Sequence, residues 1–471
     1  MSIRPFAIAV VAVTLSACSG ETSSQSPSIA VTISPPSAAL LVGATARFTA
    51  TVSGAARGDV IFTVVEGEPG GSIGADGRYV APRTPGGFHV RATSADDPTR
   101  YVEATVTVAD YQRGITQMPD GSNARDHHTA TLLPDGSVLV VGGIAFEQRA
   151  LAAADRFDPG ARAFRDGGAL VVPRMAHAAV LLGSGEVLVT GGWDPGVPGT
   201  SSGPASGATE LYDAAASRFR AGPDMLVPRR GHSMTLLANG SVLVAGGVEH
   251  RGRGFPATTA SELFDPPKEA FRPGQHMVQG RWQHTATLLA DGRVLLVGGR
   301  ADDYPSAYAA PALSSAEVYD PAAGEFTATG SLLASRYGHS ATRLADGRVL
   351  VLGGETTQGF GAGPAQVPTA EIWDPATGAF TSAGSLADGR GFHAAVELND
   401  GTFLLVGGNR NEGLPSGTTE IFDPARGAPT PGPQMSERRI RATATKLATG
   451  EVLVVGGNSS AAAVRPVDLF L

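Results

Sequence analysis

The amino-acid sequence predicts an all-β protein, in which a small β-sandwich precedes a seven-bladed β-propeller. Two observations predict the propeller. A pair of glycines recurs about every 52 residues, and each copy of the repeat contains four short β-prone segments separated by turn residues. A period near fifty residues with four strands per repeat is typical of propellers, which have one blade per repeat. The first glycines of the pairs are Gly142, Gly191, Gly246, Gly298, Gly353, Gly407 and Gly456.

The fifth copy shows how one repeat forms a blade. Two β-prone runs, residues 340–344 and 349–352, are joined by Asp346-Gly347. Asp-Gly is typical of a two-residue hairpin, because its turn needs positive φ at both central positions. A third run, 370–374, ends at a proline, and an aromatic residue begins a fourth. We therefore expect four antiparallel strands in each repeat.

The third segment has its own signature, Glu, an aliphatic residue, an aromatic residue and Asp, at 210–213, 262–265, 317–320, 371–374 and 420–423. Together with the double glycine and the aromatic residue of the fourth segment, it resembles the Kelch repeat family, whose propellers include the central domain of galactose oxidase. The resemblance implies the fold. It leaves the function open, because Kelch propellers include binding scaffolds, structural modules and a few enzymes.

The two ends of the repeat region complement each other. After the seventh glycine pair, only a third strand, 467–470, remains before the chain stops, whereas residues 114–126 match the fourth strand and following loop of other repeats. We expect these segments to pair and close a ring of seven blades over residues 111–471, which covers edges that would otherwise stay open.

The N-terminus, residues 1–17, resembles a bacterial lipoprotein signal peptide. A short basic start and a short apolar run lead to Leu-Ser-Ala-Cys at 15–18. The resemblance implies cleavage before Cys18, a lipid on its sulfur and attachment to a membrane of the cell envelope. Ser19 follows in place of an aspartate, which favours the outer membrane. Cys18 is the only cysteine, so no internal disulfide is possible.

Residues 18–28 are polar and predict a flexible tether. From 29 to 110, short alternating runs follow one another at about ten-residue spacing, which predicts a small β-sandwich. The segments at 71–82 and 87–94 are similar to bacterial immunoglobulin-like domains. This domain is expected to act as a spacer.

Composition limits the partners. The formal charge is −8, Lys268 and Lys446 are the only lysines, and the sequence has no basic run. Such a chain is not expected to bind nucleic acid. We expect a monomer that binds an unidentified protein or glycan.

The motif R-x-x-H precedes the first strand of six repeats, and the seventh has Arg439 with Ala442 in place of histidine. Residues repeated in every blade lie around a ring, too dispersed for one metal ion, so we expect the histidines to pack between blades. The arginines are expected to pair with third-strand carboxylates, as a repeated structural contact. The arginines are Arg125, Arg174, Arg229, Arg281, Arg336, Arg390 and Arg439. The carboxylates are Asp155, Glu210, Glu262, Glu317, Glu371, Glu420 and Asp468.

Enzymatic motifs are scarce. Copper oxidases resembling galactose oxidase need a cysteine crosslinked to tyrosine, and Cys18 is expected to carry the lipid. The sequence has no G-x-S-x-G, H-E-x-x-H or phosphate-binding glycine loop. We therefore name no catalytic residue, metal or cofactor and expect a non-enzymatic binding module. A sugar mutarotase or epimerase, which needs only a few acid–base side chains, is an open alternative, as is a purely structural envelope protein.

The loops after the glycine pairs differ from repeat to repeat, whereas the turns on the opposite face are short and alike. Variable loops on a rigid scaffold are common binding sites, and aromatic and arginine side chains are common anchors. The predicted anchors are Trp193 and Tyr304. The candidate binding residues are Trp193, Asp194, His250, Arg251, Arg253, Asp302, Asp303, Tyr304, Tyr308, Phe360, Asn409, Arg410 and Asn458.

Overall fold

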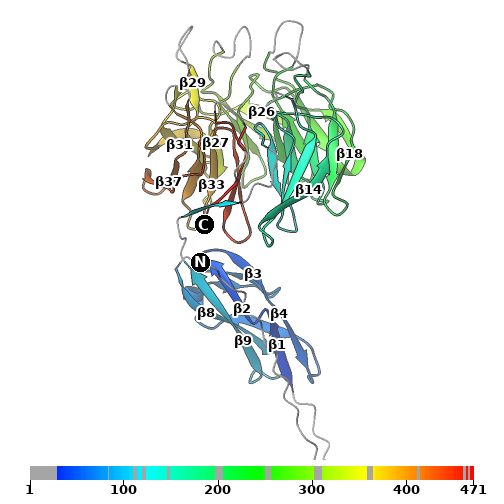
Figure 1. Ribbon diagram of the computed structural model, residues 1–471, viewed down its shortest axis with the longest axis vertical. Coiled ribbons are helices and arrows are strands. Elements are labelled where there is room, and N and C mark those ends of the chain that lie inside the picture. Colours follow the sequence, from blue (N-terminus) through cyan, green and yellow to red (C-terminus); the bar gives the residue numbers. More distant parts are fainter. Residues whose placement is uncertain are drawn as a thin grey trace, which may run out of the picture. The chain divides into compact units, whose positions relative to one another are not determined.

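The protein is described by a computed structural model that covers residues 29–82, 84–109, 114–118, 124–145, 149–196, 205–249, 256–301, 310–357, 364–410, 414–459, 463–464 and 467–470. Within these ranges the chain forms strands and two single-turn 3-10 helices, so the predicted all-β class is confirmed (Figure 1). The chain divides into two compact units. The first takes most of residues 1–107, and the second contains Val108–Leu471.

The first unit contains three small sheets. The largest has the order β2 (Ser37–Leu41), β9 (Tyr101–Ala109), β8 (Gly86–Ser94), β5 (Val60–Val64). A second has the order β3 (Thr45–Arg47), β7 (Arg78–Val80), β6 (Ser72–Ile73), and β1 (Ala30–Ser34) pairs with β4 (Thr49–Ser53). A 3-10 helix, Glu68–Gly70, precedes β6.

The core of this unit is built around two aromatic side chains. Phe48 and Tyr79 are fully buried, and their rings meet edge to face at 6.2 Å. The hydroxyl of Tyr79 donates to the carbonyl of Gly70 at 2.5 Å, which satisfies the one polar atom that this ring brings into the core.

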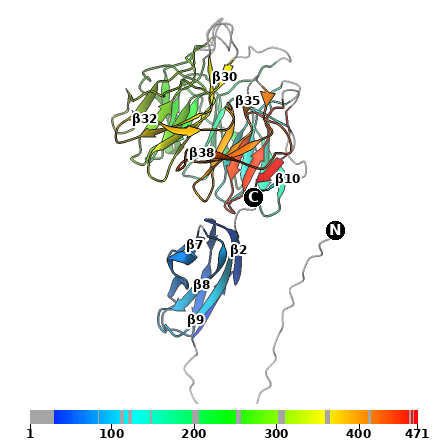
Figure 2. The same cartoon turned by 90° about the vertical axis from the view of Figure 1, so that its left-hand side faces the viewer.

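The second unit contains seven four-stranded antiparallel sheets, one per repeat, so the predicted seven blades are confirmed. In Figure 2, strand β10 lies beside the C-terminal strand, which is coloured red. Blade one is β11 (Thr129–Leu132), β12 (Val138–Val141), β13 (Ala153–Asp158) and β14 (Ala163–Ala169). Blade two is β15 (Ala178–Leu181), β16 (Val187–Thr190), β17 (Thr209–Asp213) and β18 (Arg218–Ala221). Blade three is β19 (Ser233–Leu236), β20 (Val242–Ala245), β21 (Ser261–Asp265) and β22 (Ala270–Pro273), with a 3-10 turn at Pro266–Lys268.

Blade four is β23 (Thr285–Leu288), β24 (Val294–Val297), β25 (Ala316–Asp320) and β26 (Glu325–Ala328). Blade five is β27 (Ser340–Arg343), β28 (Val349–Leu352), β31 (Thr369–Asp374) and β32 (Ala379–Ser385). Blade six is β33 (Ala394–Glu397), β34 (Phe403–Val406), β37 (Thr419–Asp423) and β38 (Ala428–Pro431). Two small hairpins extend the loops of blades five and six: β29 (Glu355–Thr357) with β30 (Pro364–Gln366), and β35 (Asn409–Arg410) with β36 (Leu414–Pro415).

The seventh blade is closed by strands from both ends of the unit. Its order is β10 (Ile115–Met118), β41 (Val467–Phe470), β40 (Val452–Val455), β39 (Thr443–Lys446). Met118 lies opposite Val467 in the β10–β41 ladder. This is the closure that the sequence predicts. It gives the last blade its outer strand and pairs the edge of β41.

The core lies between the blades. All four residues of each second strand are buried, for example those of β24 and β28. Leu295 and Val297 of blade four share one apolar cluster with Val349 and Val351 of blade five, and similar clusters join the other neighbours. Strands covered on both faces read as continuous apolar runs, which explains the Val- and Leu-rich segment before every glycine pair.

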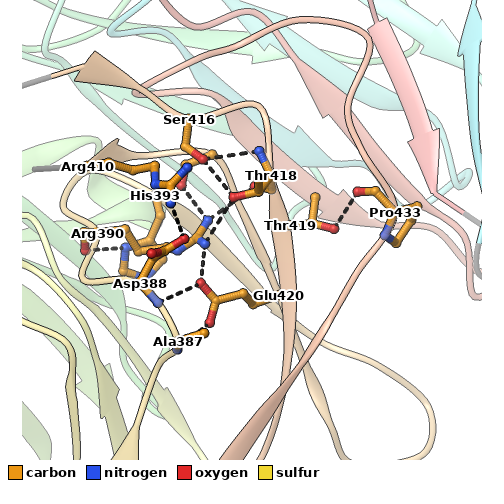
Figure 3. Close-up of polar contacts among 11 residues, drawn as sticks. Ala387, Asp388, Arg390, His393, Arg410, Ser416, Thr418, Thr419, Glu420 and Pro433 are labelled. Carbon is orange, nitrogen blue, oxygen red and sulfur yellow. Dashed lines mark hydrogen bonds and ion pairs between the residues drawn. The ribbon is translucent and has the colours of Figure 1, made fainter.

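A buried arginine anchors the loop that precedes each first strand. In blade six, Nη1 of Arg390 donates to the carbonyl of Gly407 at 2.9 Å, and Nη2 contacts the carboxylate of Glu420 (Figure 3). Glu420 also accepts from the backbone amide of Ala387 at 2.8 Å. Because the guanidinium is fully buried and bonded to both the glycine pair and the third strand, it fixes the loop to its own blade.

The same contact is present in every blade. All seven arginines are fully buried, and each lies against the third-strand carboxylate of its own blade. The pairs are Arg125–Asp155, Arg174–Glu210, Arg229–Glu262, Arg281–Glu317, Arg336–Glu371, Arg390–Glu420 and Arg439–Asp468.

The histidines of R-x-x-H connect neighbouring blades. Nε2 of His284 lies 2.9 Å from the hydroxyl of Ser233 at the start of the preceding blade, and His339 makes the same contact with Thr285 at 3.0 Å. Burial, and then the charge of the nearby arginine, lowers the pKa of His284 to about 3. These histidines are therefore neutral at physiological pH and act as structural links.

Candidate ligand pocket at the propeller axis

Two residues follow the constant arginine of each repeat and precede the histidine, or Ala442 in the seventh repeat, and these two differ from blade to blade. The second of the two has a left-handed backbone conformation in all seven blades, with φ between 50° and 61°. These residues are His127, Ala176, Gly231, Gln283, Gly338, Phe392 and Arg441. Five of them are not glycine, and such residues adopt this conformation only when the surrounding structure enforces it.

The enforcing contact is a chain of backbone hydrogen bonds around the axis. The amide of Gly231 donates to the carbonyl of Ala176 at 3.0 Å, and the amide of Phe392 donates to Gly338 at 2.7 Å. Six such bonds connect consecutive members from His127 to Arg441. We call the seven residues the axial belt.

The first variable residue of each motif pairs with the residue that follows the glycine pair of its own blade. Antiparallel bridges join Met175 to Trp193, Trp282 to Arg300, and Tyr337 to Glu355, with similar bridges in the other blades. The residue after each glycine pair therefore lies near the axis of the propeller. It is the first residue of the long loop, and it lies beside the axial belt.

These residues line a cavity of about 850 Å³. All seven blades contribute to its wall. The lining residues are His127, His128, Met175, Ala176, His177, Trp193, Arg230, Gly231, Trp282, Gln283, Arg300, Tyr337, Glu355, Pro364, Phe392, Asn409, Arg441, Ala442 and Thr443. The cavity is called the axial pocket below.

Arginine side chains stack on aromatic rings around the axial pocket. The guanidinium carbon of Arg230 lies 4.4 Å from the ring centre of Trp193, and that of Arg441 lies 4.5 Å from Phe392. Arg300 lies between two rings, 4.6 Å from Tyr337 and 5.5 Å from Trp282. Stacking holds each planar cation in a defined orientation at the pocket wall.

Two glycines of the belt make room for these rings. A Cβ added to Gly338 would lie 3.0 Å from the ring of Phe392, and one added to Gly231 would lie 3.3 Å from Trp282. Each ring comes from the next blade and rests on the glycine of the preceding one. A large ring in one R-x-x-H motif therefore requires a glycine in the motif of the preceding blade at these two places.

The charged groups of the pocket are unbalanced. Among the described residues that line it, three are arginines and one, Glu355, carries a carboxylate. Nδ1 of His127 lies 3.1 Å from Asp126, but burial and the charge of Arg441 lower the pKa of this histidine, so it adds no charge at neutral pH. Oε1 of Glu355 accepts from Nδ2 of Asn409 at 2.8 Å. The described part of the pocket wall thus combines a net positive charge with a carboxylate–amide pair.

The loop residues chosen from the sequence have different locations. Trp193 and Asn409 line the axial pocket. Arg410 pairs with Asp388 at 2.5 Å (Figure 3). Both residues line a second cavity, of about 370 Å³. The carboxylate of Asp194 accepts a hydrogen bond from the backbone amide of Gly196 at 3.0 Å, and Asn458 forms an antiparallel β-bridge with Ile440. Neither Asp194 nor Asn458 lines the axial pocket.

The remaining candidates lie outside the described residues. They are Cys18, His250, Arg251, Arg253, Asp302, Asp303, Tyr304, Tyr308 and Phe360.

Most of the pocket wall was not anticipated from the sequence. The sequence selection omitted Arg230, Trp282, Tyr337, Phe392 and Arg441, which occupy the variable positions of R-x-x-H. The sequence feature that could have identified these residues is the contrast between constant and variable positions within R-x-x-H. Its arginine recurs in all seven blades and its histidine in six, while the two positions between them carry aromatic, charged and glycine residues in different blades.

Among the described residues, no group of three or more His, Cys, Asp or Glu side chains is arranged to hold a metal ion. In the same part of the chain, no helix has the length and apolar character that a membrane span requires.

Comparisons with known proteins agree with the propeller. No family model matches the chain. Beta-scruin from Limulus polyphemus is 25% identical over 203 residues, which are 43% of this chain and 21% of that protein. The match thus spans about a fifth of this curated relative.

Two solved structures share the fold. YjhT superposes with a TM-score of 0.52 and 14% identity over 67% of this chain and 99% of its own. A fungal alcohol oxidase of the AA5 family, in complex with copper, gives a TM-score of 0.58 and 18% identity over 76% of this chain and 75% of its own. With the seven four-stranded sheets and their repeated motifs, these likenesses show a β-propeller fold for the second unit and support its Kelch type.

Proposed function

We propose that the chain is an envelope-anchored lipoprotein whose Kelch-type propeller is a non-enzymatic binding module, with the ligand held in the axial pocket. One observation carries the binding role. The positions that vary within an otherwise constant motif are the ones that converge on a cavity of about 850 Å³. Cavities of about 300–1,000 Å³ with aromatic walls and a few polar groups are typical small-ligand sites.

In this arrangement, one set of residues holds the loops in place and another set is available to contact a ligand. The buried arginine–carboxylate pairs and the interblade histidines fix the position of every loop, and the residues between them are left to vary. A pocket on such a scaffold needs little reorganisation when a ligand binds, which favours affinity. This site suits a protein or glycan that binds on the face of the propeller where the axial pocket opens.

The anchor and spacer complete the proposal. The Leu-Ser-Ala-Cys segment supports lipid attachment at Cys18, and the resemblance at 71–82 and 87–94 supports an immunoglobulin-like spacer. Expression of Cys18→Ala should give protein without lipid on mass analysis. Lipidated protein from this variant would contradict the anchor.

A thermal-shift screen tests the binding role. Sugars, short oligosaccharides, amino acids and organic acids are each added at millimolar concentration, and compounds that raise Tm are followed by calorimetry. We expect binding to be lost in Trp282→Ala, which alters the pocket, and kept in Asp346→Ala, which alters an exposed turn at the opposite end of blade five.

Two results would contradict the binding role. One is equal binding by both variants, and the other is a screen in which no compound raises Tm. Exchange of sugar anomers catalysed by the protein, followed by NMR, would instead support the mutarotase alternative.

A further inference from the structure

The axial pocket contains a buried cation that is incompletely paired. Arg300 is only 4% exposed, and its Nε atom has no hydrogen-bond partner in the described part of the chain. Its Nη2 makes one long contact, 3.4 Å, with the carbonyl of Ala310. A buried charged donor without an acceptor is unfavourable, and an acidic group on a ligand would relieve that cost.

The pocket also contains buried acceptors that lack donors. Oε1 of Gln283 and Oδ1 of Asn409 are buried, and neither has a hydrogen-bond partner among the described residues. The orientation of the Asn409 amide is determined by Glu355, since only its NH₂ group can face that carboxylate. Both oxygens need donors, and hydroxyl groups are suitable ones.

Aromatic rings complete the wall. Trp282 and Tyr337 hold Arg300 between them, and Tyr337 meets Phe392 edge to face at 5.9 Å. Such rings offer apolar surface to a compact ligand while the polar atoms between them set its orientation.

We propose that the axial pocket binds an acidic sugar, whose carboxylate contacts Arg300 and whose ring hydroxyls donate to Gln283 and Asn409. This inference rests on the proposed binding function and specifies its ligand class. An acidic peptide side chain would satisfy the cation, but it brings few donors for the two buried acceptors. A neutral sugar brings the donors and leaves Arg300 unpaired.

The test uses matched pairs of sugars. D-galacturonate and D-glucuronate, with their di- and trisaccharides, are compared with D-galactose, D-glucose and the corresponding neutral oligosaccharides by calorimetry on the full chain. We expect at least one uronate to bind about tenfold or more tightly than its neutral counterpart, because the neutral sugar leaves a buried charge unpaired.

Two variants assign the contacts. Arg300→Gln should remove the preference for the acid, whereas Gln283→Leu should weaken acid and neutral sugars alike, because it removes a hydroxyl acceptor. Arg293→Gln is the control, since Arg293 belongs to an exposed ion pair at the turn of blade four. If Arg300→Gln does not fold, Arg441→Gln replaces it, and its loss of positive charge should weaken acidic sugars selectively.

Each outcome is decisive. Neutral sugars that bind as tightly as uronates, or an acid preference that survives Arg300→Gln or the variant that replaces it, would overturn the inference and leave the binding function intact. Absence of all sugar binding would also overturn it. The proposed function would then fall only if the wider screen of small molecules found no ligand either.

Discussion

Oγ1 of Thr190 lies 2.8 Å from Nε2 of His232, and this contact spans two blades. In five other pairs of adjacent blades, the histidine instead meets a Ser or Thr hydroxyl at the start of a first strand. Blade two has Ala178 at that position, and Thr190, which lies opposite Ala178 in the ladder, supplies the hydroxyl. Between blades six and seven, both partners are replaced, by Ala394 and Ala442.

Removing the hydroxyl of Thr190 should destabilise the propeller. Thr190→Ala leaves the buried Nε2 of His232 unpaired, which should lower the free energy of unfolding by about 1–3 kcal/mol, measured in urea. Thr190→Ser keeps the hydroxyl and is the control. Adding Ala178→Thr to Thr190→Ala should restore stability, and failure of both rescues would show that the hydrogen bond is not the cause.

The buried arginine–carboxylate pairs should be far more important for stability than the exposed ones. Arg336→Ala removes the cationic partner of the buried Glu371, so we expect the free energy of unfolding to fall by about 3–5 kcal/mol. Arg348→Ala removes an exposed pair with Asp346 and should change stability by less than about 1 kcal/mol. Equal effects of the two substitutions on unfolding in urea would contradict the structural role of the R-x-x-H arginine.

The interblade histidines should make the protein sensitive to mild acid. Burial lowers the pKa of His128, His177, His284 and His393 to about 3, and that of His232 and His339 well below the ordinary value. An unfolded histidine has a pKa of about 6.5, so below that pH the unfolded chain binds more protons than the folded one. Stability is therefore full above pH 6.5 and is lost as pH falls toward 3.

Each buried histidine contributes at most about 1.4 kcal/mol per pH unit to this loss. The free energy of unfolding in urea, measured from pH 8 to pH 5, should be level above pH 7 and decline steeply below 6.5. A level profile down to pH 5 would mean that the interblade histidines accept protons in the folded state.

Ring closure depends on one short strand. Met118 of β10 is buried in the apolar cluster that joins blades one and seven, whereas its neighbour Gln117 is exposed. Met118→Ala should lower the free energy of unfolding by about 2–5 kcal/mol. Gln117→Ala should change it by less than about 0.5 kcal/mol. The reverse ranking would show that β10 does not support the seventh blade in solution.

The repeat made most of the fold predictable. The run at 349–352 was expected as a second strand and is β28, and the segment at 467–470 was expected to pair with 114–118 and does so as β41 and β10. Periodicity, turn residues and the missing fourth strand are local or countable signals, and they were sufficient.

The pocket was less predictable, for a physical reason. Trp193 was recognised because it begins a variable loop. Gln283 and Phe392 were not, because their left-handed conformation is imposed by hydrogen bonds from neighbouring blades and has no signature in a non-glycine residue. Ring closure also brings Arg441 toward His127, more than 300 residues earlier in the chain, and no local pattern encodes that proximity.

The most direct test of the account uses the three tryptophans of the chain. Trp193 and Trp282 line the axial pocket, whereas Trp373 is 1% exposed in the core between two blades. In protein labelled with 5-fluorotryptophan, titration with a compound that raises Tm should shift the ¹⁹F resonances of Trp193 and Trp282 and leave that of Trp373 unchanged. A stabilising ligand that moves neither pocket resonance would contradict binding at the propeller axis.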